Sequence, residues 1–135
     1  MPGHARTGRE PHHHGQWRPD PLDLDDQALV ADVRDKGSWV LTGCGHEGVM
    51  NICASAQITG RAPAAVIGGF HLSGRHFEPP IGPTRDAFAE LAPDFLVPAH
   101  CTGWKATDAV ASHFPDAFLQ TASARFAFEG TDARA

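Results

Sequence analysis

The sequence lacks the features that would assign it to a membrane, to secretion or to nucleic acid. None of its apolar stretches approaches the roughly 20 residues that a membrane span needs. The N-terminus lacks the apolar core of a signal peptide. Basic residues are scattered along a chain whose formal net charge is −5. We therefore expect no nucleic-acid partner and no membrane association.

Cysteine is also scarce. The three cysteines, Cys44, Cys53 and Cys101, are odd in number and form no CxxC pair. This pattern does not suit a disulfide framework, so a reducing, cytoplasmic location is the default expectation. What remains is an ordinary globular balance of 41% hydrophobic and 20% charged residues. The 135 residues are enough for one domain with a core.

The first 22 residues differ in composition from the rest. They hold four of the nine histidines and very few apolar side chains. We expect residues 1–22 to be disordered or loosely ordered, residues 23–130 to form the domain and residues 131–135 to be a tail. The run His12-His13-His14 is interpreted as a solvated tract, because consecutive histidines rarely converge on one ion at structural geometry.

The hydrophobic pattern of the remaining chain predicts alternating strands and helices. Residues 27–34 and 38–43 predict a β-hairpin around the turn Asp35-Lys36-Gly37. Further on, helices are expected over 47–58, 84–91 and 102–113, the last capped by Thr102, and strands over 64–67, 94–97, 117–121 and 125–128. This order predicts an α/β layered fold.

The central strands indicate a sheet that needs cover on both faces. Residues 64–67 and 95–97 are apolar on both faces, which normally means that both faces are buried. Three short helices can cover only one of them. Either the hairpin strands curl over the other face, or a part of the domain lies outside this chain.

Three histidines each follow an apolar, strand-like run after a few small residues. His46 follows the run at 38–42, His71 the run at 64–67 and His100 the run at 95–97. In an α/β protein such residues line a site along the carboxyl edge of the sheet. Imidazole is the commonest protein metal ligand. Three His ligands with an open fourth position suit a catalytic zinc, whose bound water has a pKa of about 7.

A second interpretation uses the cysteines. Cys44 and Cys101 each neighbour one of these histidines, and a Cys/His nucleophilic pair would need the two side chains to face each other from separate loops. Cys53 lies on the apolar face of an expected helix and is interpreted as a core residue. His76 in a polar loop and His113 near a helix end fit solvated or capping roles.

The three histidine loops carry recognisable motifs. Residues 41–52 read LTGCGHEGVMNI, residues 66–72 read VIGGFHL and residues 97–104 read VPAHCTGW. In this order they resemble the metallo-β-lactamase-fold hydrolases, and in particular the branch of 7,8-dihydropterin-6-methyl-4-(β-D-ribofuranosyl)aminobenzene-5′-phosphate synthase-like proteins. The resemblance covers about residues 22–129.

The resemblance implies an αββα sandwich with one or two metal ions, usually zinc, between two sheets, of which this chain resembles the C-terminal half. It implies that His46 is a first-site ligand and that His100 is the last ligand of the second site. His71 stands where many relatives carry a bridging Asp. The positions that the resemblance places beside the ligands or in the pocket are Cys44, Gly45, Gly69, Phe70, Cys101 and Thr102.

The HxHxDH motif that supplies the other ligands of such hydrolases does not occur in the sequence. We therefore expect a truncated family member that is inactive or weak alone and that acts on a small molecule if it is active. Two alternatives stay open. One is a non-catalytic interaction protein that pairs through its uncovered sheet face, with a second copy or with a complementing N-terminal half. The other is a mononuclear zinc hydrolase built on His46, His71 and His100.

Overall fold

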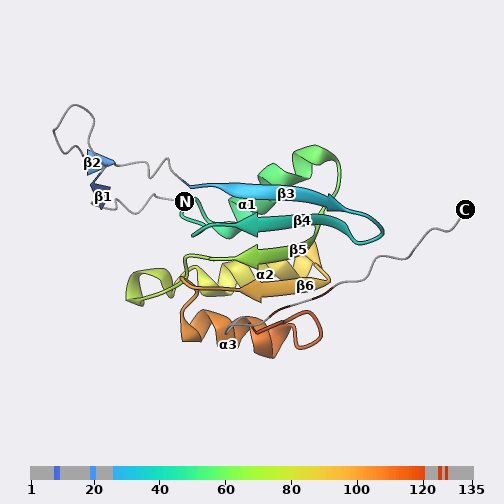
Figure 1. Cartoon of the computed structure of the whole chain (residues 1–135). Helices are drawn as coiled ribbons and strands as arrows, with labels where there is room; N and C mark the ends of the chain where they lie inside the picture. The colour runs from blue at the N-terminus through green and yellow to red at the C-terminus, as the bar shows by residue number, and fades with distance from the viewer. Residues whose placement is uncertain (1–7, 10–18, 21–25, 121–124, 126, 128–135) are drawn as a thin grey trace, which may run out of the picture.

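A four-stranded sheet in the order β3-β4-β5-β6 forms the centre of the chain (Figure 1). The computed structural model describes residues 8–9, 19–20, 26–120, 125 and 127. Strands β3 (Ala28–Val33) and β4 (Gly37–Thr42) pair in antiparallel fashion, and β5 (Pro63–Gly68) and β6 (Phe95–Pro98) extend the sheet in parallel from β4. A separate antiparallel pair joins β1 (Gly8–Arg9) to β2 (Pro19–Asp20).

Helices supply the crossover connections that parallel strands require. Helix α1 (Val49–Ala56) lies between β4 and β5 in the chain, α2 (Ile81–Leu91) between β5 and β6, and α3 (Trp104–His113) after β6. Two short 3-10 turns, η1 (Gln57–Thr59) and η2 (Arg75–Phe77), complete the connections. The predicted hairpin and the predicted α/β class are confirmed. No described helix combines the length and the apolar character that a membrane-spanning segment needs.

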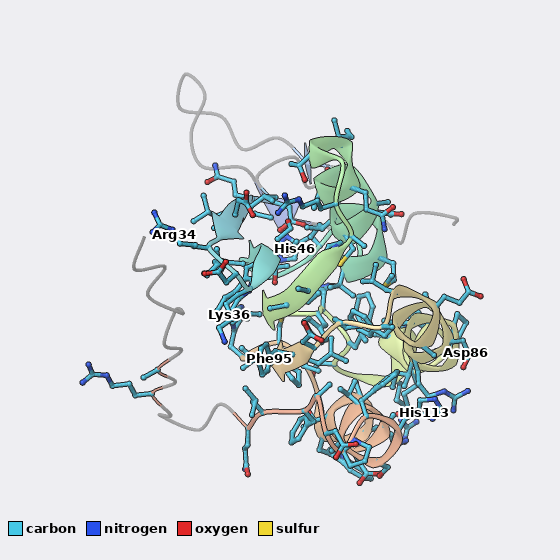
Figure 2. All side chains as sticks on the ribbon, turned by 90° about the vertical axis from the view of Figure 1, so that its right-hand side faces the viewer. Arg34, Lys36, His46, Asp86, Phe95 and His113 are labelled. Carbon is cyan, nitrogen blue, oxygen red and sulfur yellow. The ribbon has the colours of Figure 1, made fainter. Side chains whose placement is uncertain are left out.

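The three helices pack against one face of the sheet (Figure 2). Val40, Val66 and Leu96 are neighbours in the strand register and are fully buried beneath the helices. Phe70 and Phe88 extend this core, with ring centroids 5.4 Å apart. This face therefore holds most of the apolar contact that stabilises the fold.

The opposite face of the sheet is apolar and carries no helix of the described part of the chain. Its side chains form a second row across the strands, made of Leu29, Leu41, Ile67 and Val97. Val97 is buried, but Leu29 is 62% exposed and Leu41 is 38% exposed. The sheet is thus covered on one face and partly open on the other, as the strand composition predicted.

Two helix starts differ from the prediction. Helix α2 begins at Ile81 rather than at residue 84 and so includes Pro83 in its first turn, where a proline costs no intrahelical hydrogen bond. Helix α3 begins at Trp104 with Gly103 at its N-cap position. The predicted cap by Thr102 is wrong, because the Thr102 hydroxyl accepts a hydrogen bond from the Phe70 N–H at 3.1 Å instead.

The last predicted strands are also different. Within 117–121 the described residues form only an isolated parallel bridge between Leu96 and Phe118, while Arg125 and Ala127 have no regular structure and the rest of 125–128 lies outside the described residues. The expected tail at 131–135 and the tract at 12–14 also lie outside the described residues. Only β1 and β2 are described within 1–22.

Candidate metal centre

The ends of the three parallel strands lie side by side. Thr42 at the end of β4 is the register partner of Gly68 at the end of β5, which in turn pairs with Pro98 at the end of β6. Each of the three histidine loops starts within a few residues of these partners. The sheet therefore brings the loops to one edge, as the strand-end pattern predicts.

Hydrogen bonds fasten the first two loops to each other. The Gly69 N–H donates to the Gly43 carbonyl at 2.9 Å, and the Thr42 hydroxyl donates to the Gly69 carbonyl at 2.8 Å. The second and third loops are joined in the same way, since the Leu72 N–H donates to the Cys101 carbonyl at 3.1 Å. The three loops consequently form one connected unit.

Asp26 holds the turn that carries His46. Its carboxylate accepts hydrogen bonds from the Gly45 N–H at 3.2 Å and from the Glu47 N–H at 3.0 Å. The His46 Nδ1 atom is buried. This role is not predictable from the sequence, because Asp26 is 19 residues from Gly45 along the chain. Asp26 is a positioning residue for the His46 turn.

His71 lies between two rings. Its ring centroid is 4.7 Å from that of His46 and 4.6 Å from that of Phe77, both in edge-to-face arrangements. The backbone of His71 has a φ of 52°, which is uncommon for a residue with a side chain and is often found at functional sites. The structure therefore brings His46 and His71 together.

His100 is grouped with the cysteines. Its Nε2 lies 3.1 Å from the Cys44 Sγ, and the Cys101 thiol donates to the Cys44 carbonyl at 2.9 Å. Among the described residues, the potential ligand atoms of Cys44, His100 and Cys101 all lie within 4.8 Å of one another. The facing Cys/His geometry that the second interpretation required is thus present between Cys44 and His100.

The thiols of Cys101 and Cys53 have different environments. Burial is the main cause that raises the pKa of Cys101 above its usual value of 9.0, although the His71 N–H bond to its sulfur acts in the opposite direction. Burial alone raises the pKa of Cys53 on α1 to about 12. Cys53 is a core residue as predicted.

Two glycines at the end of β5 make room for this grouping. Neighbouring strands are roughly 4.8 Å apart, so β4 and β6 are separated by about 10 Å. A Cβ at Gly68 would collide with the Thr42 carbonyl, and a Cβ at Gly69 would collide with the Cys101 sulfur. Because neither residue has a side chain, the loops after β4 and β6 can meet over the end of the strand between them.

The remaining predicted residues lie around or away from this edge. Gly45 has a φ of 73°, and a Cβ there would lie 2.5 Å from the Gly69 carbonyl oxygen. His76 is exposed in η2. His113 lies on α3, apart from His46 in Figure 2, and packs against Phe114. Neither His76 nor His113 joins the group.

A hollow of about 220 Å³ lies next to the His46 turn, between β3 and α1. Asp26 and Glu47 line it together with Val30, Ile52 and Ala56. Small-molecule sites usually measure about 300–1,000 Å³. The hollow beside the His46 turn is thus smaller than a usual small-molecule site.

The fold and the three histidine loops together indicate a class of protein. A four-stranded α/β sheet with histidine loops at its carboxyl edge is similar, in fold and in sequence, to part of a metallo-β-lactamase superfamily hydrolase. The crystal structure of Tm1679, a metal-dependent hydrolase of the β-lactamase superfamily, matches with a TM-score of 0.68 and 34% identity, over 81% of this chain and 42% of that one.

A particular enzyme is similar at the sequence level. The 7,8-dihydropterin-6-methyl-4-(β-D-ribofuranosyl)-aminobenzene-5′-phosphate synthase of Methanocaldococcus jannaschii is 33% identical over 97 residues. The match covers 70% of this chain and 33% of the enzyme. The chain therefore spans about a third of that relative. No protein-family model matches the chain.

Proposed function

We propose that this chain is the metal-binding C-terminal part of a metal-dependent hydrolase, with zinc as the metal and a small molecule as the substrate. The observation that carries the proposal is the pairing of His46 and His71, with ring centroids 4.7 Å apart, at the edge to which His100 also belongs. The similarity to a metal-dependent hydrolase of the same fold supports it.

The donor set of this edge fits zinc, which binds imidazole nitrogen and thiolate sulfur. His46, His71 and His100 would hold the metal, and we assign the remaining ligands to a part of the fold that this chain does not contain. Zinc held there would supply hydroxide at neutral pH, since zinc lowers the pKa of a water ligand to about 7. Asp26 accepts two hydrogen bonds from the His46 turn, and Phe77 contacts the His71 ring edge to face.

The open face of the sheet supports the need for a second part. Leu29 and Leu41 expose 62% and 38% of their surface there, and a contiguous exposed apolar patch usually marks an interaction surface. The chain spans only 42% of its structural neighbour, so the occupant we propose is the remaining sheet of the same fold. A non-catalytic assembly role through this face, with a second copy of the chain, is the second candidate.

Metal binding by the two paired histidines is tested by zinc titration and elemental analysis. The chain is used with His12–His14 replaced by Ser and with Cys44 and Cys101 replaced by Ser, so that other strong zinc donors are removed. His46→Ala and His71→Ala should each weaken zinc binding at least 10-fold, since even groups outside the ligand set contribute about 10–100-fold. His113→Ala should leave it unchanged. Unchanged binding in both site variants would contradict the proposal.

Two further experiments test whether the metal site of this chain is incomplete and whether the open face of the sheet binds a partner. The unaltered chain should show little hydrolysis of simple ester and phosphodiester substrates with zinc present, and tight binding of two zinc ions with rapid turnover would contradict the proposed division of the site. Leu41→Lys should abolish self-association or association with a complementing half in sedimentation experiments. Ile58→Lys is the matched control, because Ile58 is 87% exposed outside the sheet, on η1.

A further inference from the structure

We propose that Cys44, His100 and Cys101 bind one thiophilic divalent cation, Zn²⁺ or Cd²⁺, through two thiolates and one imidazole. This site goes beyond the proposed hydrolase centre. It shares His100 with that centre and otherwise uses residues that the histidine ligand set leaves out.

The three donor atoms are already close to ligand geometry. Zinc binds Cys sulfur at about 2.3 Å and His nitrogen at about 2.0–2.1 Å, which separates tetrahedral ligand atoms by roughly 3.5 Å. The Cys44 Sγ and the His100 Nε2 are 3.1 Å apart, and all three donor atoms lie within 4.8 Å of one another. Small side-chain rotations are therefore sufficient to surround an ion.

Backbone features at this edge already favour the binding of an ion by the three donors. The end of β5 has no side chains at Gly68 and Gly69, which lets Cys44 and His100 meet from β4 and β6. The His71 N–H donates to the Cys101 sulfur at 3.3 Å. A donor in this position stabilises a thiolate, because hydrogen bonds to charged acceptors are the stronger ones.

The binding step balances without an oxidant. One M²⁺ ion replaces the two thiol protons, which pass to solvent, and the His100 nitrogen donates its lone pair to the ion. The Cys101 thiol loses the hydrogen bond that it donates to the Cys44 carbonyl at 2.9 Å. A metal–sulfur bond forms in its place. Thiolate ligands favour soft cations over Mg²⁺ or Ca²⁺. His100 is exposed, so a fourth position on the solvent side can hold water.

Cobalt spectroscopy tests the site directly. Under reducing conditions, Co²⁺ added to the full chain with His12–His14 replaced by Ser should bind at this site and produce a sulfur-to-cobalt charge-transfer band. Cys44→Ser and Cys101→Ser each remove one of the two thiolates, so each should weaken the band and lower the Co²⁺ affinity at least about 100-fold, because a lost ligand costs more than a lost outer partner. Cys53→Ala, His46→Ala and His71→Ala should keep it. A band of unchanged intensity and Co²⁺ affinity in both serine variants, or no band in the parent chain, overturns the proposal.

Alkylation of the unsubstituted chain provides a test that does not depend on variants. Iodoacetamide should label Cys44 and Cys101 in the metal-free protein, and Cd²⁺ should protect both, while the buried Cys53 stays unlabelled in either state. Labelling of Cys44 that Cd²⁺ does not slow overturns the proposal. This site does not use His46 or His71, so the two proposals fail in different experiments. Failure of this site removes the cobalt band and the Cd²⁺ protection, whereas failure of the hydrolase proposal leaves zinc binding unchanged in His46→Ala and His71→Ala.

Discussion

Gly69→Ala probes the contact on which the site geometry depends. An added Cβ would collide with the Cys101 sulfur and would lie 2.7 Å from the Gly43 carbonyl oxygen and 3.0 Å from the Cys44 Cα. Two of these neighbours are backbone atoms, so relief requires the loops to separate. Overpacking of this kind costs about 1–3 kcal/mol. The reduced entropy of the unfolded chain offsets about 0.4–1 kcal/mol of that cost.

Thermal unfolding followed by circular dichroism measures the effect. A net loss of about 1–2 kcal/mol corresponds to a Tm lower by roughly 4–16 °C in a domain of this size. The matched control is Gly82→Ala, because nothing lies within 4 Å of a Cβ there and Gly82 lies in α2, where Ala is favoured by up to about 1 kcal/mol. A Gly69→Ala protein as stable as the Gly82→Ala protein, with an unchanged cobalt band, would contradict the steric role of Gly69.

Other perturbations test the core, the loop contacts and the buried thiol. Phe88→Ala should destabilise the fold by about 3–5 kcal/mol, measured by urea unfolding, because Phe88 is fully buried. Thr102→Val should cost about 1–3 kcal/mol in the same assay, because it leaves the Phe70 N–H without its acceptor. Cys53 has a folded pKa of about 12 against an ordinary 9.0, so the unfolded state loses this proton first and stability should fall as pH rises through that interval. Cys53→Ala should remove this decrease, and an equal decrease in the variant would contradict it. Asp26→Ala should loosen the His46 turn, seen as faster amide hydrogen exchange there.

The sequence predicted the architecture well where the pattern is local. The turn Asp35-Lys36-Gly37 and the β-like apolar runs on either side of it specify the hairpin, and the helical spacing after His46 specifies α1. The predicted start of α2 at residue 84 is wrong, because Pro83 is compatible both with a loop and with a first helical turn. Thr102 was misassigned because its hydroxyl bonds to a backbone group of another loop.

The site was predictable only in part. The strand-end positions of His46, His71 and His100 indicate one common edge, and the motifs around them carry the resemblance. The sequence raises a facing Cys/His pair only as an alternative. Whether Cys44 meets His100 depends on the register of three strands and on the absence of side chains at the end of the middle one. The role of Asp26 depends in the same way on the folded hairpin.

The most direct test of metal binding at this edge of the sheet is the zinc affinity of His100→Ala, measured by titration in the chain with His12–His14 replaced by Ser. His100 belongs to both proposed ligand sets, whereas His113 lies on α3 apart from this edge. We expect at least about 100-fold weaker binding in His100→Ala and parent-like binding in His113→Ala. Equal zinc affinity in the two variants would contradict the claim that this edge of the sheet binds a metal.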